Sequence, residues 1–337
     1  MSRTPRPIAS ISLDLDDLWT YLRTHGDPGW TSRPSFLDSF VPMVLDVLDE
    51  EQVTLTFFVV GADAAAPRHR RLLRAIADRG HEIGNHSFEH EPWLQRYGRP
   101  RLEAEIVRTQ EAIADATGTR PRGFRGPGYS WSATLFELLA DHGFLYDAST
   151  LPTYIGPLAR AYYFWSAKLP AEERARRHAL FGTLRDGLMP VRAYRWQLAD
   201  GRTLLEIPVT TLPGLKLPFH LTYIHYLSRV SEAVALGCLR AALGICRLTD
   251  TSPSFILHPL DLLGGDRVPQ LAFFPAMDQP SHRKLALFRR VLGLYRERFR
   301  LEPIAVHARE LSERNRLGVR RTHPLPDEHP LTETAEV

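Results

Sequence analysis

The chain has 337 residues, of which 44% are hydrophobic, so it is long enough for two domains or one large α/β barrel, and we expect one barrel. Its net charge is only +3, and its Arg-rich clusters contain few aromatic residues, so we expect no nucleic-acid partner. The polar start of the chain lacks a signal-peptide core, and no uninterrupted apolar span could cross a bilayer. Cys238 and Cys246 are predicted to be reduced thiols in the core, which favours a cytoplasmic protein.

Short apolar runs alternate with longer segments of helical periodicity along most of the chain. The expected strands are 8–15, 53–60, 82–85, 123–125, 145–148, 203–208, 254–258 and 301–305. The expected helices are 35–51, 68–79, 99–117, 132–142, 228–247 and 281–298. Strands that alternate with helices at this spacing predict right-handed βαβ units, and therefore a parallel sheet or a barrel.

Two segments depart from this alternation. Residues 151–200 are rich in Tyr, Trp, Pro and Arg without a clear period, which indicates an insertion in the catalytic part of the chain, residues 1–311. Charge and Pro dominate residues 312–337, so we expect a mobile polar tail there.

Carboxylates follow the first expected strand. Asp14, Asp16 and Asp17 stand where a buried strand ends, and such carboxyl ends carry the active sites of parallel α/β folds. A helix cap is the structural alternative for this cluster. A Ca²⁺ loop is a second alternative, but the sequence has no Glu at the EF-hand spacing.

His86 and His90 stand four residues apart just after another expected strand. On one helical turn this spacing would point both imidazoles the same way, as metal ligands require, although paired surface or capping histidines would show the same spacing. The zincin pattern fails, because the position four residues after His81 is Asn85. A catalytic zinc usually has three protein ligands, so one carboxylate could complete the set and another could act as general base on the water.

Two other classes of protein remain in view. A serine hydrolase would need a Gly-x-Ser-x-Gly elbow, and the nearest stretch, residues 128–132, lacks the final Gly. A noncatalytic carbohydrate-binding barrel could stack sugars on the aromatic residues of the insertion, including Tyr154 and residues 162–165.

Six motifs in chain order resemble those of NodB-type polysaccharide deacetylases, carbohydrate esterase family 4. They are LDLDD at 13–17, TFFVVG at 56–61, GHEIGNHSFEH at 80–90, FRGP at 124–127, GFLYDAS at 143–149 and LHP at 257–259. The resemblance implies a distorted (β/α)7 barrel that binds Zn²⁺ or a similar ion. It also implies hydrolysis of an N-acetyl, or sometimes N-formyl, group on an amino sugar or glycan precursor.

The resemblance also implies roles for single residues. Asp14 matches the catalytic base, and His86 and His90 match metal ligands. Asp16 is the expected third ligand, because alternate residues of an extended segment point to the same side, and Asp17 is the alternative.

Further matches follow the fourth and seventh expected strands. Arg125 matches the arginine that orients the base, and Pro127 and Tyr129 lie where the family binds the substrate oxyanion through a backbone N–H. His258 matches the general acid. The Asp that often orients this histidine in the family has no counterpart here, so Asp261 or Glu206 is expected to replace it.

Residues 213–227 form an apolar, Tyr-containing stretch with few charges. Such a stretch can pack on the barrel or at a homo-oligomer interface. Alternatively it lies against a membrane surface and presents a lipid-linked amino sugar, as in the branch of the family that deformylates or deacetylates polyprenyl-linked sugars. The second alternative predicts a membrane-associated protein with peripheral contact.

Overall fold

The computed structural model describes residues 6–156, 186–314 and 317–322. Seven parallel strands form its centre, in the spatial order β7-β5-β4-β3-β2-β1-β8. They are β1 (Ile8–Leu15), β2 (Thr56–Val59), β3 (Glu82–Asn85), β4 (Gly123–Phe124), β5 (Tyr146–Asp147), β7 (Thr203–Glu206) and β8 (Ser254–Leu257).

The two ends of this sheet meet. After β7 the backbone N–H of Thr210 donates to the carbonyl of Ser254, at the start of β8, over 2.9 Å. The predicted distorted (β/α)7 barrel is therefore confirmed. All carboxyl ends of the parallel strands lie at one rim, where side chains from distant parts of the chain can meet.

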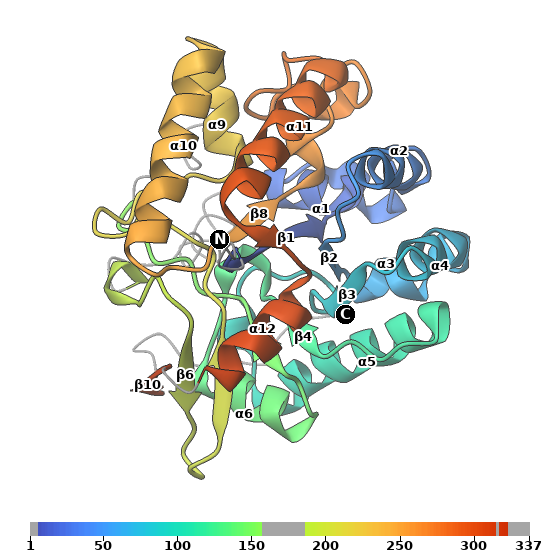
Figure 1. The fold of residues 1–337 in the computed structure, drawn as a ribbon. Helices are drawn as coiled ribbons and strands as arrows, with labels where there is room; N and C mark the ends of the chain where they lie inside the picture. Colours follow the sequence, from blue (N-terminus) through green and yellow to red (C-terminus); the bar gives the residue numbers. More distant parts are fainter. Residues whose placement is uncertain (1–5, 157–185, 315–316, 323–337) are drawn as a thin grey trace.

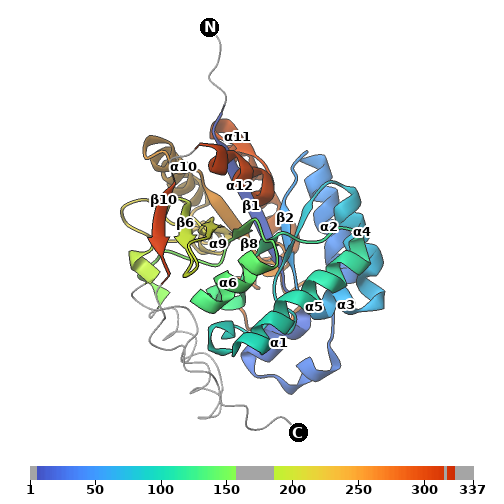
Figure 2. The ribbon, with the colours of Figure 1, turned by 90° about the horizontal axis from the view of Figure 1, so that it is seen from below.

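Helices surround the strands in both views (Figures 1 and 2). They are α1 (Leu18–His25), α2 (Leu37–Glu50), α3 (Gly61–Ala65), α4 (Arg70–Asp78), α5 (Arg99–Thr117), α6 (Ala133–Asp141), α9 (Leu221–Ser228), α10 (Glu232–Leu248), α11 (Ser281–Arg298) and α12 (Ile304–Glu313). Within the described ranges, no helix is long and apolar enough to span a membrane.

The largest hydrophobic cluster joins β1, β2 and β8 to the helices that cover them. Leu13, Phe57 and Leu257 from the strands pack with Val44 of α2 and Leu292 of α11. All eight residues of β1 are buried, as expected for a strand covered on both faces. This packing fixes the strand ends that carry the polar residues of the site.

The expected helices lie where they were predicted, except near prolines and in apolar stretches, but α1 and α3 were not among them. The bounds of α5 and α11 are as predicted. The expected helix 228–247 begins only at Glu232, and a separate helix, α9, precedes it. The expected strand 301–305 is limited to β9 (Arg300–Leu301), since Pro303 begins α12, which the sequence did not suggest.

Two more strands extend the sheet beyond β7. β6 (Tyr194–Gln197) is antiparallel to β7, and β10 (Gly318–Arg321) pairs with β6 in parallel. β10 lies inside the segment expected to be a tail, and this strand was not foreseen. Residues 157–185, which hold most of the expected insertion, and residues after 322 lie outside the described residues.

The two cysteines do not share one environment. Cys246 is buried in α10, as expected, whereas Cys238 is exposed on the same helix. The prediction of two core thiols was wrong for Cys238, because eight residues of helix do not return to the same angular position.

Candidate active site

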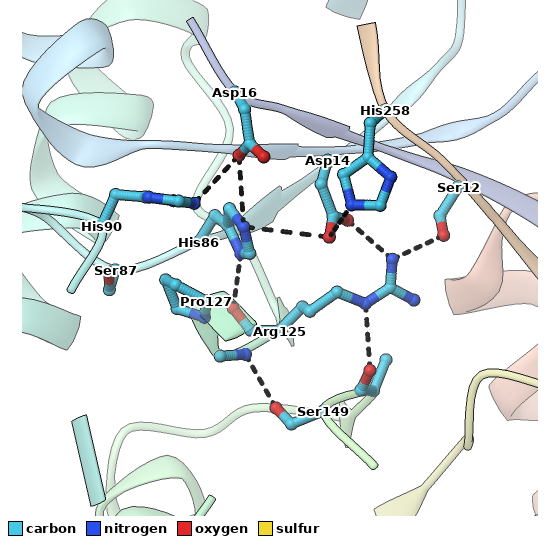
Figure 3. Close-up of polar contacts among 12 residues, drawn as sticks. Ser12, Asp14, Asp16, His86, Ser87, His90, Arg125, Pro127, Ser149 and His258 are labelled. Atoms are coloured by element: carbon cyan, nitrogen blue, oxygen red, sulfur yellow. Dashed lines mark hydrogen bonds and ion pairs between the residues drawn. The ribbon is translucent and has the colours of Figure 1, made fainter. Parts of the chain in front are cut away.

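The candidate site lies at the carboxyl rim, where Figure 3 shows side chains from β1 and from the segments that follow β1, β3, β4 and β8 pointing toward one another. Asp14 is the second-last residue of β1, and Asp16 follows the strand directly. Both are buried, with 4% and 7% of their surfaces exposed. Their spacing of two in extended backbone places both carboxylates on the same side, as predicted.

His86 and His90 converge, but not because they share a helical turn. Residues 86–90 are not helical, and Ser87 and His90 have φ angles of 59° and 53°. The loop is held by Glu105, whose Oε2 accepts the backbone N–H groups of Phe88 and Glu89. The predicted convergence is present, with ring centroids 5.0 Å apart, whereas its predicted helical cause was wrong.

The ligand atoms of Asp16, His86 and His90 all lie within 4.8 Å of one another. Asp16 Oδ1 lies 3.0 Å from His90 Nε2 and 3.5 Å from His86 Nε2. The Arg125 carbonyl lies 2.7 Å from His86 Nδ1 and accepts a hydrogen bond from its N–H, which leaves the Nε2 lone pair directed at the carboxylates. A backbone carbonyl behind a histidine ligand is the usual way to orient a metal-binding imidazole.

The electrostatics also fit a cation. Burial alone would raise the pKa of the Asp16 carboxyl, but His90 and His86 outweigh it and lower that pKa, so the group stays ionised. Burial alone would lower the pKa of the His86 imidazole. The neighbouring Asp14 and Asp16 carboxylates outweigh burial, so this pKa is raised. Asp16 Oδ1 is buried without a hydrogen-bond partner, as an oxygen reserved for a metal would be. These residues therefore fit a divalent ion.

Asp17, the alternative ligand, points elsewhere. Its Oδ1 accepts the backbone N–H groups of Leu18, at 2.7 Å, and Phe36, at 3.0 Å, and so caps α1. It lies in a second cluster with Asp63 and His69. The geometry thus favours Asp16 as the third ligand.

Arg125, which follows β4, holds Asp14 of β1 across the barrel. One guanidinium nitrogen donates to Asp14 Oδ1 and to Ser12 Oγ, both at 2.7 Å, and Nε donates to the Ala148 carbonyl at 3.0 Å. The side chain is fully buried, and its guanidinium lies 4.3 Å from the Phe58 ring centroid. A charge held this rigidly fixes the orientation of the carboxylate.

His258 stands on the opposite side of Asp14, with its Nε2 3.9 Å from Asp14 Oδ2. Asp261 lies behind it: Oδ2 accepts the His258 backbone N–H at 2.8 Å and is 3.8 Å from Nδ1. Burial alone would lower the pKa of His258, but Asp261 and Asp14 raise it to about 9. The imidazole is therefore protonated at neutral pH.

Glu206, the other residue considered for orienting His258, has different partners. It is fully buried and accepts hydrogen bonds from Thr150 Oγ1 and Trp196 Nε1. Burial and the neighbouring Asp147 raise its pKa well above the usual value. Asp261 is thus the residue placed to orient His258.

The start of α9 adds residues that sequence reasoning missed. Thr222 Oγ1 donates to Asp261 Oδ1 at 2.7 Å. His220 is buried beside this group, and burial lowers its pKa to about 4, so it is neutral. A His and a Thr within the apolar stretch 213–227 were the available signal, and the surrounding apolar residues concealed it.

Pro127 and Tyr129 form a tight turn after β4. Pro127 is buried next to His86 and Arg125 in Figure 3. The N–H of Tyr129, the expected oxyanion donor, donates instead to the Gly126 carbonyl at 3.1 Å. The turn uses this donor for its own closure, so the geometry does not favour its assignment to the substrate.

The fold and site together define an α/β barrel with a candidate metal centre at the carboxyl rim. Residues 6–146 match the family model for polysaccharide deacetylase. The chain is 28% identical over 148 residues to a peptidoglycan deacetylase of Helicobacter pylori, covering 43% of this chain and 50% of that protein. It is 37% identical over 132 residues to a chitooligosaccharide deacetylase of Sinorhizobium fredii, covering 36% and 60%.

A crystal structure of an inferred polysaccharide deacetylase from Mycobacterium smegmatis shares the fold, with a TM-score of 0.62 and 21% identity. That comparison covers 96% of this chain and 97% of the other. The family model over residues 6–146 and these relatives thus support the resemblance to NodB-type polysaccharide deacetylases that the motifs predict. It spans between half and three-fifths of the two sequence relatives, 50% and 60% of their lengths.

Proposed function

We propose that this protein removes an N-acyl group from an amino sugar or glycan precursor by hydrolysis, with N-acetyl as the first candidate for that group. The observation that carries the proposal is the placement of Asp14. Arg125 binds its Oδ1, while its Oδ2 faces His86 Nε2 at 3.8 Å and His258 Nε2 at 3.9 Å. A carboxylate between a candidate metal ligand and a protonated imidazole suits amide hydrolysis, which needs both a base and an acid.

Asp16, His86 and His90 would hold a divalent ion, for which Zn²⁺ is the first candidate because it accepts both carboxylate and imidazole ligands. Such an ion would supply a Lewis acid that polarises the amide carbonyl and lowers the pKa of a neighbouring water. Chain residues provide the remaining chemistry.

Asp14 accepts the proton from the attacking water in this proposal. The Arg125 guanidinium keeps Oδ1 occupied, so Oδ2 is the oxygen free to act as base. Fixing the carboxylate in advance reduces the reorganisation required in the transition state.

His258 donates the proton that the leaving amine needs when the C–N bond breaks. Its raised pKa keeps the proton on the ring at neutral pH, and Asp261 stabilises the charged form. About a quarter of the side chain, 27%, is exposed, so a substrate amine can reach it.

Mass spectrometry of a substrate panel tests this function. Metal-loaded protein would be incubated with chitooligosaccharides, peptidoglycan fragments, nucleotide sugars and lipid-linked amino sugars. We expect loss of an acetyl or formyl group from at least one class, abolished by chelation. A noncatalytic carbohydrate-binding barrel would bind a sugar without releasing acid, and a serine hydrolase would survive chelation.

A lipid-linked substrate, and with it a deformylase, is the second candidate, because apolar side chains stand exposed at the carboxyl rim. Leu215 and Leu217 are 66% and 46% exposed on the loop that follows β7. Thr153 Oγ1 donates to the Lys216 carbonyl at 2.9 Å and ties this loop to the segment after β5, where Tyr154 is 45% exposed. Exposed apolar residues of this kind favour contact with a membrane surface.

A further inference from the structure

A second group of potential metal ligands lies behind the candidate active site. It comprises Asp17 at the start of α1, Asp63 in α3 and His69 just before α4. One ligand atom from each lies within 4.8 Å of the others. Their exposed fractions are 0%, 3% and 0%, so bulk water does not hydrate these groups.

Each carboxylate has one oxygen that the protein satisfies and one that it leaves alone. Asp17 Oδ1 caps α1, and Asp63 Oδ1 accepts the indole N–H of Trp19 at 2.9 Å. The Oδ2 atoms of both residues are buried without a hydrogen-bond partner among the described residues. Buried carboxylate oxygens are normally paired or bound to a cation, and two such oxygens in one cluster therefore require an explanation.

His69 is held on both edges of its ring. Its Nδ1 lies 3.1 Å from the Asp63 carbonyl oxygen, and its Nε2 lies 3.3 Å from Ser35 Oγ. With Nδ1–H donating to the carbonyl, Nε2 carries the lone pair, which faces the Ser35 hydroxyl and which a bound cation would take over. The His86 ring has the same arrangement, with Nδ1 against the Arg125 carbonyl.

Few cationic side chains lie near the two buried carboxylates of this cluster to balance their negative charge. Burial raises the pKa of Asp63 and lowers that of His69, so burial works against the charged form of each. Arg33 and Arg68 lower the pKa of Asp63 only in part, and Arg33 already pairs with Glu89. A divalent cation would neutralise two carboxylates at once.

We propose that Asp17, Asp63 and His69 form a second, structural divalent-cation site. The Ser35 hydroxyl, which also accepts the Leu37 backbone N–H at 3.1 Å, is the fourth candidate ligand. A donor set of carboxylate oxygens and one imidazole suits Zn²⁺, and a closed, buried set is typical of structural rather than catalytic zinc. The bound ion would fasten the segment after β1 to α3 and to the start of α4. It would thereby support the chain next to Asp16, and the proposal holds whether or not the rim is catalytic.

Zinc content measured by mass spectrometry tests the proposal on the full chain, dialysed after loading with Zn²⁺ alone. We expect two ions per chain in the wild type and one in His86→Ala/His90→Ala. Asp63→Asn should also hold one ion and melt at a lower temperature. Glu82→Gln is the matched control: it alters a half-buried carboxylate, in β3, and should keep both ions.

Anomalous diffraction at the zinc edge from wild-type crystals keeps the test independent of variant folding. A peak among Asp17, Asp63 and His69 is expected. Absence of that peak in zinc-loaded crystals, with Asp17 and Asp63 sharing a proton instead, would overturn the proposal. If only the peak at Asp16, His86 and His90 were missing, the proposed function would fail and the second site would stand.

Discussion

Asp14 and His258 lie side by side because β1 and β8 are adjacent parallel strands. The pairing of Leu13 with Leu257 brings the next residue of each strand to the same level at the rim. Asp14 Oδ2 and His258 Nε2 are 3.9 Å apart as a result. The register of two paired strands, rather than the conformation of a loop, therefore sets the distance between the proposed base and the proposed acid.

The pH dependence of activity should reveal the state of His258. A general acid must carry its proton, so kcat/KM of the wild type should fall as pH rises through the His258 pKa of about 9. Asp261 stabilises the imidazolium, and Asp261→Asn should move this alkaline limb to lower pH. Thr222→Val, which removes the hydrogen bond to Asp261, should move it less far in the same direction. An alkaline limb at the same pH in all three proteins would contradict the assignment.

Stability should depend on pH through His81, which lies at the other end of the barrel. Its Nδ1 accepts the Leu55 backbone N–H at 3.1 Å, so the folded protein holds the ring neutral, and burial lowers its pKa to about 4. Between pH 6.5 and about 4 the unfolded chain takes up a proton here that the folded chain does not. The contribution of His81 to stability is therefore complete above pH 6.5 and is lost as pH falls toward 4.

Urea unfolding of the wild type and His81→Gln at neutral and mildly acidic pH measures this contribution. The free energy of unfolding of the wild type should fall more steeply on acidification, with a difference in slope of at most about 1.4 kcal/mol per pH unit. Parallel slopes for the two proteins would show that His81 does not titrate differently on folding.

Membrane contact should depend on the rim residues Leu215 and Leu217. Wild-type protein should cosediment with anionic liposomes, and Leu215→Ser/Leu217→Ser should cosediment less, since interfacial binding scales with buried apolar area. Phe219, although part of the same apolar stretch, packs against the core and is unsuitable for this test. Leu248→Ser is the control, because Leu248 is 88% exposed but lies just before β8, at the opposite end of the barrel. No cosedimentation by the wild type would leave packing or self-association as the role of the stretch.

Much of the barrel could be predicted because its strands are short, apolar and interrupted by clear helix ends. The bounds of β1 and β3 match the expected ones, and Gly118 ends α5 in left-handed backbone. β10 could not be foreseen, because its partner β6 lies more than a hundred residues earlier and its own sequence is charged. Local pattern carries no information about such long-range pairing.

The site residues followed from the resemblance of their motifs to the family, whereas their supports did not. Sequence named Asp14, Arg125 and His258, but Ser12 and Thr222 became visible only once the fold placed them against Arg125 and Asp261. Hydrogen-bond partners of this kind come from separate elements and leave no local pattern in the chain. The positive φ angles that turn the His86–His90 loop were likewise not readable from residue types.

Metal content and turnover of Asp14→Asn and Asp16→Asn, measured side by side, test the central claim most directly. Asp14→Asn should lower turnover by about 10²- to 10⁴-fold while keeping the ion at the rim, since an amide cannot accept the proton. Asp16→Asn should lose that ion together with the activity, because one of three protein ligands is removed. Asp17→Asn should leave the rim ion in place. Full turnover in Asp14→Asn, or loss of the rim ion from Asp14→Asn and its retention in Asp16→Asn, would contradict the account.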